Sequence, residues 1–521
     1  MKDENKEQAK EFYKKALALK KEEKYEEAIK YFDKAIELQP NNTNYYNMRG
    51  IVKIDAEDNE GAIKDFTKCI ELNPKHSIAY NNRGNAKYNL EEYEEAIKDY
   101  DICIERLPKS DYVYCNRGDA KYELGEYEEA IEDYSKAIEL KPKNADYYYA
   151  RGAAKYKLKY YEEAIKDFDK AIELNPKYTD AYSYKGNIDI NLYKYEEAIK
   201  NYDRCIKLDK KNKEHYNNRG DAKCYLGNLE EGIKDFDKAI ELDNNYADAY
   251  SNRGLAKYNL KQFDEAIKDL NKAIELAPFN YYIYNLRGAI KNDIGNYEEA
   301  IKDFNKSIEL NPFYPNPYFN RGYTKYWLKQ YDEALEDYNK CLELDNNYID
   351  AYNEIGITKI RLANIELKNN NILKAKELLN EAVNYFNKCI ELDSNYPESY
   401  DGRGYANTKL ANIERNNNNL SKAIEIYNEC LKDFYKTIEL NSEHEYALNS
   451  LGYIKNILSN IQKENITEEE YKKLKSESLE SFKKAYKLAD NELKEKIKKY
   501  IIKLSKENDI TGTNFCKYLE K

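Results

Sequence analysis

The sequence contains few of the residues that interrupt regular secondary structure. Its 521 residues include only 10 prolines and 19 glycines, and many of these recur at a regular spacing. Long apolar runs are also lacking, so no segment is expected to span a bilayer. The first eight residues are highly charged and hold no apolar stretch of the kind that a secretory signal needs. We therefore expect a helix-rich cytoplasmic chain that does not enter a membrane.

An excess of positive charge is also missing, because the formal net charge is −11. Nucleic-acid binding relies on a basic surface that releases counterions from the phosphates. The charge therefore argues against nucleic acid and against an anionic membrane as partners.

Cysteine pairs at metal-binding spacing are absent. The nine cysteines lie apart, with no Cys-x-x-Cys and no Cys/His cluster. Five of them stand where other parts of the chain carry alanine or serine: Cys69, Cys103, Cys205, Cys341 and Cys389. This pattern indicates small buried side chains in a reducing compartment, and it predicts no metal site and no cofactor held by cysteine.

What the sequence does contain is a period of 34 residues. Glycine recurs at this step ten times and then twice more at steps of 48: Gly50, Gly84, Gly118, Gly152, Gly186, Gly220, Gly254, Gly288, Gly322, Gly356, Gly404 and Gly452. A small residue usually follows twelve positions later and an aromatic residue four positions after that, as Ala96 and Tyr100 follow Gly84. Such self-similarity is typical of a stacked repeat protein.

Within each repeat the apolar residues are spaced by three and four, which predicts two amphipathic helices. Repeat 3, from Ser77 to Ser110, shows the pattern, with a break between its helices near Leu90. If the recurring glycine is counted as position 8, the alanine is at position 20 and the aromatic residue at position 24. We expect the glycine and alanine to lie where the two antiparallel helices cross, and the aromatic residues at positions 4 and 24 to fill the space beside them. One hairpin cannot bury both of its faces, so neighbouring hairpins must stack.

This pattern resembles the tetratricopeptide repeat family. In repeat 3 the matching residues are Tyr80, Gly84, Ala96, Tyr100, Cys103 and Pro108. The resemblance extends from about residue 9 to residue 489 and covers thirteen repeats. It implies an all-α superhelix, that is, a tetratricopeptide solenoid, in which the first helix of each repeat lines the concave face.

The steps of 48 predict that the last three repeats have longer helices. In repeats 11 and 12 the added residues are expected as seven on each helix, which then meet at Asn369–Asn371 and at Asn416–Asn419. In repeat 13, Thr467 and Glu470 form a capping-box pattern for the second helix. The expected organisation is an N-terminal capping repeat (1–42), a regular array (43–348), three extended repeats (349–490) and a capping helix with a tail (491–521), frayed after Asn508.

An arginine and an aspartate vary together between repeats. Nine repeats carry arginine before the glycine and aspartate at position 23 (or its equivalent in repeat 12), whereas the four repeats without the arginine also lack the aspartate. Arg117 and Asp133 are one such pair. We interpret the covariation as an ion pair within the repeat, at the edge of the helix crossing. The alternative is that whole repeats were copied as blocks.

On the implied concave face, polar and aromatic residues around the glycine are candidates for peptide binding. Asparagine has donors and an acceptor for a peptide backbone, and tyrosine presents a flat apolar surface with a polar tip. The candidates are Asn82, Asn85, Tyr88, Asn116, Asp119, Tyr122, Tyr156, Asn187, Asn218, Asp221, Asn252, Tyr258, Asn320 and Tyr326. The alternative is that these residues only solvate the groove and pack neighbouring helices.

The sequence predicts a non-catalytic scaffold that binds peptide segments of other proteins along this face. The three histidines stand at or beside repeat boundaries, with no nucleophile or carboxylate pattern recurring near them, so no enzyme activity is expected. Two alternatives remain: a structural protein that associates with itself, and an RNA-binding helical repeat protein.

Overall fold

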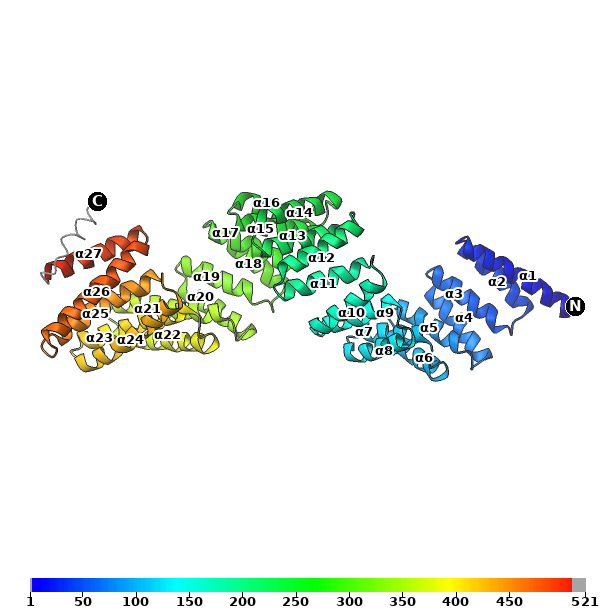
Figure 1. The fold of residues 1–521 in the computed structure, drawn as a ribbon, viewed down its shortest axis with the longest axis horizontal. Helices are drawn as coiled ribbons and strands as arrows, with labels where there is room; N and C mark the ends of the chain where they lie inside the picture. The colour runs from blue at the N-terminus through cyan, green and yellow to red at the C-terminus, as the bar shows by residue number, and fades with distance from the viewer. Residues whose placement is uncertain (1, 508–521) are drawn as a thin grey trace. The chain divides into compact units, whose positions relative to one another are not determined.

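The structure is a computed structural model that describes the backbone of residues 2–507 and the side chains of residues 5–501. Across this range it contains 27 α-helices and no strand, arranged as helical hairpins that follow one another along the chain (Figure 1). The predicted all-α repeat fold is confirmed. None of these helices is long and apolar enough to cross a membrane. The tail expected to fray after Asn508 lies outside the described residues.

The chain divides into two compact units, Met1–Lys261 and Gln262–Lys521, and each is described by itself. The N-terminal unit contains α1 (Lys2–Lys21), α2 (Tyr25–Leu38), α3 (Thr43–Asp55), α4 (Asn59–Leu72), α5 (Ser77–Asn89), α6 (Tyr93–Arg106), α7 (Asp111–Glu123), α8 (Tyr127–Leu140), α9 (Ala145–Lys157), α10 (Tyr161–Leu174), α11 (Thr179–Asn191), α12 (Tyr195–Leu208), α13 (Lys213–Tyr225), α14 (Leu229–Leu242) and α15 (Ala247–Asn259).

The C-terminal unit contains α16 (Phe263–Leu276), α17 (Tyr281–Asp293), α18 (Tyr297–Leu310), α19 (Asn316–Trp327), α20 (Tyr331–Leu344), α21 (Ile349–Lys368), α22 (Ile372–Leu392), α23 (Pro397–Asn416), α24 (Leu420–Leu440), α25 (Glu445–Gln462), α26 (Glu468–Leu488) and α27 (Asn491–Glu507).

Local sequence explains where the helices begin and turn. Several first helices start after an asparagine whose side chain accepts a backbone N–H, as Asn144 does from Asp146. Many second helices begin with two acidic residues, which the positive end of the helix dipole favours. Between the two helices one residue adopts a left-handed conformation, with φ near +61° at Glu91 and +81° at Gly125.

The recurring glycine allows close approach, but its nearest neighbour differs from the expected one. A Cβ built on Gly84 would lie 2.6 Å from the ring of Tyr100, and one built on Gly118 would lie 2.8 Å from the ring of Tyr134. The aromatic residue at position 24 therefore packs directly on the glycine, rather than beside it. Both rings are almost fully buried, so a larger residue at position 8 would displace the core.

The predicted ion pairs are present in the eight repeats where both partners belong to one unit. In repeat 4, Arg117 donates from Nε to Asp133 Oδ2 at 2.9 Å and from Nη2 to Asp133 Oδ1 at 2.6 Å. Such a paired geometry is stronger than a single contact. The same two bonds recur from Arg49, Arg83, Arg151, Arg219, Arg287, Arg321 and Arg403. The partners of the ninth predicted pair, Arg253 and Asp269, belong to different units, and that pair stays a prediction.

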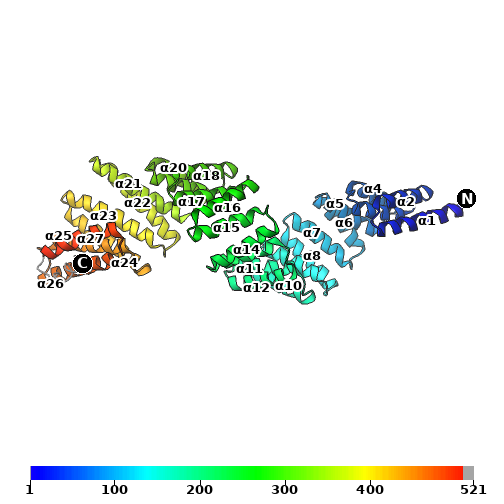
Figure 2. The same cartoon turned by 90° about the horizontal axis from the view of Figure 1, so that it is seen from above.

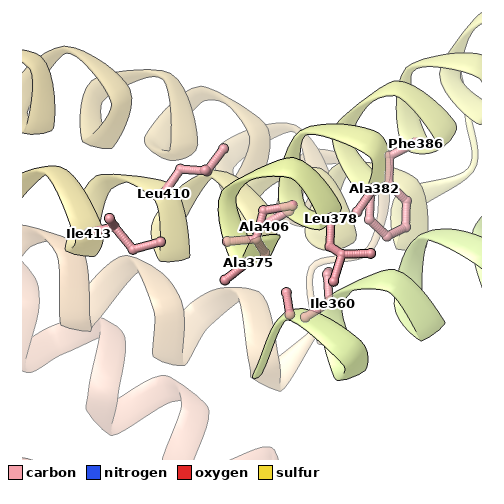
Figure 3. Packing of buried hydrophobic residues seen from close by; sticks show 10 residues of the cluster. Ile360, Ala375, Leu378, Ala382, Phe386, Ala406, Leu410 and Ile413 are labelled. Atoms are coloured by element: carbon pink, nitrogen blue, oxygen red, sulfur yellow. The ribbon is translucent and has the colours of Figure 1, made fainter. Parts of the chain in front are cut away.

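The extended repeats have the expected lengths. Helices α21 and α23 have 20 residues and α22 and α24 have 21, against 13 and 14 in most regular repeats. The hairpins turn at Asn370 and Asn418, and Thr467 and Glu470 form the predicted capping box of α26. Figure 2 shows these helices from above, coloured yellow to red. Their added length builds a larger core, in which Ile360, Leu378, Phe386 and Ala406 lie close together (Figure 3).

Helix α27 covers the last hairpin, as the sequence predicts for a capping helix. Leu493, Ile497 and Ile501 are buried against α25 and α26, in one cluster with Phe482. Tyr500 stacks on Phe482 with ring centroids 5.4 Å apart. The side chain of Leu504, also expected to point inward, lies outside the described residues.

Candidate functional site

The first helices of neighbouring repeats lie on the inner side of each unit. Helix α5 contacts α7, α7 contacts α9, α21 contacts α23, and α23 contacts α25, whereas no pair of neighbouring second helices comes comparably close in the described part of the chain. Stacked hairpins curve toward the side on which their helices are closest. All of the sequence-predicted site residues lie on first helices.

The predicted asparagines form a ladder between repeats. Asn82 donates from Nδ2 to Oδ1 of Asn47 in the preceding repeat at 3.1 Å, and Asn116 donates to Asn81 in the same way at 3.1 Å. The same bond joins Asn252 to Asn217 at 3.2 Å and Asn320 to Asn285 at 3.0 Å. In each case the residue two before the glycine donates to the residue three before the preceding glycine. These donors therefore already join neighbouring repeats.

The polar residues that directly follow the glycine also accept hydrogen bonds within the structure. Asn85, Asp119 and Asn187 each accept a hydrogen bond from the buried tyrosine at position 24 of the same repeat, at 2.9, 2.8 and 2.7 Å. Asp221 accepts from Asn252 at 3.1 Å. Burial raises the pKa of Asp119 and raises the pKa of Asp221 to about 7.

The predicted tyrosines pack against the next helix. The rings of Tyr88, Tyr122 and Tyr326 each meet, edge to face, the tyrosine that begins the second helix of their repeat, and Tyr156 meets its counterpart at a tilt. Tyr258 is half-buried on α15. Asn218 accepts from its neighbour Asn217 at 3.3 Å. In the described structure these candidates thus hold the inner face together, and their role in peptide binding stays a prediction.

The ladder stops in the extended repeats. Asn353, Asp401 and Asn449 stand three residues before Gly356, Gly404 and Gly452, which is where the ladder acceptors stand in other repeats. Their Oδ1 atoms are buried and accept no hydrogen bond from the described residues. Three acceptors on three successive inner helices are therefore left without a donor.

No ladder bond forms there because the donor position carries no asparagine, as is also the case at Ala150, Tyr184 and Leu286 in regular repeats. Opposite Asn353 the donor position is occupied by Gly402, where an added Cβ would come within 2.4 Å of the Phe386 ring. Opposite Asp401 the position is occupied by Ser450, whose side chain is shorter. The larger core of the extended repeats thus excludes an asparagine from at least one of the two donor positions.

A cavity of about 910 Å³ lies where the ladder stops. Its walls come from the inner helices α21, α23 and α25, from the end of α19 and from the start of α27: Trp327, Asn353, Glu354, Ile357, Ile360, Arg361, Asn364, Tyr396, Glu398, Asp401, Gly402, Tyr405, His444, Tyr446, Asn449, Ser450, Asp490, Glu492, Leu493 and Lys496. We call this cavity the inner pocket. Three of its aromatic residues, Trp327, Tyr405 and Tyr446, are 54%, 40% and 51% exposed, so the pocket offers both apolar surface and unpaired polar atoms.

The inner pocket is acidic. Burial raises the pKa of Glu354 to about 7, and the charge of Asp350 adds to the shift. Burial also raises the pKa of Asp401 to about 6, although His444 acts in the opposite direction. Carboxyl groups with raised pKa values in a cavity are common at functional sites.

Sequence reasoning did not find the inner pocket. It selected residues that repeat in register, whereas the pocket depends on an interruption of that register at Gly402. Two residues before the glycine, asparagine is replaced by Glu354, Gly402 and Ser450 in turn. Regular repeats also replace it, by Ala150, Tyr184 and Leu286, so the replacement alone does not indicate the pocket.

Comparison with known proteins agrees with the repeat pattern. Tetratricopeptide repeat profiles match residues 9–42, 43–76, 77–110, 145–178, 179–212, 247–280, 315–348 and 371–396. A further profile, described as a TPR repeat, matches residues 118–159, 220–261 and 288–329. No curated protein sequence matches the chain.

Several solved structures are similar to parts of the chain. YrrB, described as a TPR protein with an unusual peptide-binding site, is 28% identical over 35% of this chain and 95% of its own, with a TM-score of 0.31. A tetratricopeptide repeat protein from Parabacteroides merdae is 22% identical over 47% and 97%, with a TM-score of 0.40. One chain of the APC/C hetero-tetramer Cut9–Hcn1 is 12% identical over 84% of this chain and 95% of its own, with a TM-score of 0.43.

The repeat profiles together cover more than half of the chain, and the helical hairpins have the lengths and the register that the repeat requires. Family membership supports a general role as a protein-interaction scaffold. The chain belongs to the tetratricopeptide repeat family.

Proposed function

We propose that this scaffold binds an extended peptide segment of a partner protein along its inner face, with the inner pocket as the anchoring site. The observation that carries the proposal is the set of three unpaired acceptors on Asn353, Asp401 and Asn449, which line one cavity. Within the same unit, Asn320 and Tyr326 on α19 are the predicted residues over which such a segment would continue.

The energetic argument concerns the cost of unpaired polar atoms. A buried acceptor without a donor costs about 1–3 kcal/mol. An extended peptide carries a backbone N–H on every residue except proline, so it can supply donors to acceptors on successive helices. Binding would recover part of the cost of the unpaired atoms, while the exposed aromatic rings of the pocket would bury apolar surface of the peptide.

The test is selection from a random peptide library displayed on phage, using the full-length chain as bait. The affinity of each enriched peptide is then measured by fluorescence anisotropy. Trp327→Ala should weaken binding by about tenfold, because an exposed aromatic anchor is the usual centre of a binding surface. Phe313→Ala is the matched control, since Phe313 is 79% exposed and does not line the pocket. Failure to enrich any peptide, or equal losses in the two variants, would refute the proposal.

A further inference from the structure

We infer that the inner pocket recognises a cationic side chain, so that the segment bound there presents an arginine or a lysine to Asp401 and its neighbours. This inference rests on the proposed peptide binding and specifies which chemical group enters the pocket. Four features support it: the kind of unpaired atoms, the balance of charge, the aromatic residue at the rim and the burial of the carboxylates.

The first feature is that the unpaired atoms are all acceptors. Asn353 lines the cavity and is only 5% exposed, and its buried Oδ1 accepts no hydrogen bond from the described residues. Asp401 and Asn449 line the same cavity, and the buried Oδ1 of each also accepts no hydrogen bond from the described residues. Lysine has three donors and no acceptor, and arginine has five donors and no acceptor. A carboxylate or a phosphate would instead add acceptors to a site that already lacks donors.

The second feature is the charge of the lining. Five carboxylates line the pocket, against two cationic side chains: Glu354, Glu398, Asp401, Asp490 and Glu492 against Arg361 and Lys496. Both cations already have partners, because Lys496 pairs with Glu492 at 2.6 Å and Arg361 donates from Nε to the Tyr326 hydroxyl at 2.8 Å. The remaining negative charge favours a positively charged ligand.

The third feature is the aromatic residue at the rim. Trp327 is the one tryptophan of the sequence, and it is 54% exposed at the end of α19. Tryptophan is the aromatic side chain that attracts a cation most strongly. Arginine fits better than lysine, because its planar group can stack on a ring while its donors reach acceptors on several helices.

The fourth feature is burial, which makes the affinity depend on pH. Besides burial, the carboxylates of Glu398 and Glu445 raise the pKa of Asp401, and His444 lowers it. Glu354 of α21, Lys496 of α27 and Asp490, which directly precedes α27, also line the pocket. A cation binds best to the ionised carboxylates, so its affinity should fall as the pH decreases through the raised pKa values, which are about 7 for Glu354 and about 6 for Asp401.

The experiment compares two fluorescein-labelled peptides on the full-length chain. One alternates glycine with arginine, and the other alternates glycine with citrulline, which has the same shape without the charge. The arginine peptide should bind, and Asp401→Asn should weaken it by about tenfold or more, because a desolvated charge pair is lost. Glu425→Gln is the matched control, because it removes one charge from an exposed position on the second helix of the same repeat. It should change the affinity by less than about twofold.

Several outcomes would overturn the inference. Equal binding of the citrulline peptide would show that charge is not recognised, and equal losses in the two variants would show general attraction to an acidic protein. The affinity of the double variant Glu354→Gln with Asp401→Asn should not fall at low pH. If its affinity still falls, that result would also count against the inference. If library peptides bind but the arginine peptide does not, the inference that the pocket recognises a cationic side chain is wrong, whereas the proposed peptide binding stands. If no peptide of any kind binds, both fail.

Discussion

The arginine that precedes the recurring glycine in nine repeats makes more contacts than a surface ion pair would. Arg117 binds Asp133 through two nitrogens, and its guanidinium lies over the ring of Tyr114 at 5.8 Å. Lys121 donates to Oδ2 of the same carboxylate at 2.8 Å, the oxygen that also accepts from Arg117 Nε. Asp133 is almost fully buried, so the aspartate is held between two cations in a partly desolvated site.

Removing one partner should therefore cost more than removing both. Arg117→Leu leaves Asp133 with Lys121 alone, and we expect a loss of about 3 kcal/mol, the lower end for breaking a buried pair. Adding Asp133→Tyr, which copies the residue that repeat 1 carries at this position, should restore part of the loss. Urea denaturation followed by circular dichroism measures both variants. Identical midpoints would mean that the two residues vary together without energetic coupling.

The pocket carboxyls predict a pH effect on stability. Burial raises the folded-state pKa of Asp401 to about 6 and of Glu354 to about 7, above the unfolded values of about 4. The folded chain then binds these protons more tightly, so their unfavourable contribution disappears as the pH falls from about 7 to about 4.

The double variant Glu354→Gln with Asp401→Asn should consequently be more stable than the natural chain at pH 8. The advantage should shrink steadily toward pH 4, measured as the difference between urea midpoints. The Glu425→Gln variant provides the baseline, since its difference from the natural chain should stay nearly constant. A double variant that is less stable at pH 8 would contradict the assignment of buried, destabilising charge.

At the scale of helices and turns, the residue in a left-handed conformation between paired helices lowers the stability of the fold when it is not glycine. Glu91 adopts φ near +61° without being glycine, whereas Gly125 occupies the same place in the next repeat with φ near +81°. A side chain in this region costs about 1 kcal/mol or more. Glu91→Gly should therefore raise the free energy of unfolding by up to about 1 kcal/mol.

The matched substitution is Gly125→Ala, which should lower stability by a similar amount. No atom lies within 4 Å of the added Cβ, so the loss would come from the backbone alone. Thermal unfolding of the two variants checks the pair. Opposite signs are required; two losses would show that Glu91 makes a contact that outweighs its strain.

The capping helix α27 permits a further prediction. Leu493 and Ile497 bury apolar surface against α25 and α26, so replacing either with alanine should cost about 2–5 kcal/mol of local stability. Glu495→Ala, at an exposed position of the same helix, should change it by less than about 0.5 kcal/mol. Hydrogen exchange in α25 and α26 is the measurement. Unchanged protection in the leucine and isoleucine variants would show that the cap is dispensable.

At the scale of the whole molecule, the sequence was sufficient to predict the fold, because each repeat carries the same residues at the same positions. The glycine of position 8, the aromatic residue of position 24 and the covarying Arg117 and Asp133 are local facts, separated by 16 residues or fewer. The steps of 48 likewise predicted the longer helices, because added residues in a hairpin must extend both of its arms.

The candidate site was harder to predict from the sequence, because it depends on contacts between different repeats. The bond from Asn116 to Asn81 joins residues 35 apart, and no periodicity indicates which asparagine donates to which. The inner pocket arises where Phe386 excludes a side chain at Gly402, a steric fact that requires coordinates. The sequence therefore predicted the repeat and the residues near its glycine, but it did not predict the inner pocket.

The third nitrogen of each arginine, Nη1, determines how strongly the contact between neighbouring repeats depends on ionic strength. Nη1 reaches back to the preceding repeat: in the N-terminal unit it often meets an aspartate, as Arg49 meets Asp33 at 2.6 Å and Arg117 meets Asp101 at 2.5 Å. In the C-terminal unit the acceptors are amides instead: Asn271, Asn305 and Asn387. Half-exposed ion pairs weaken when salt screens them, whereas amide acceptors carry no net charge to screen. Concentrated salt would thus loosen the junctions of the first unit and spare those of the second.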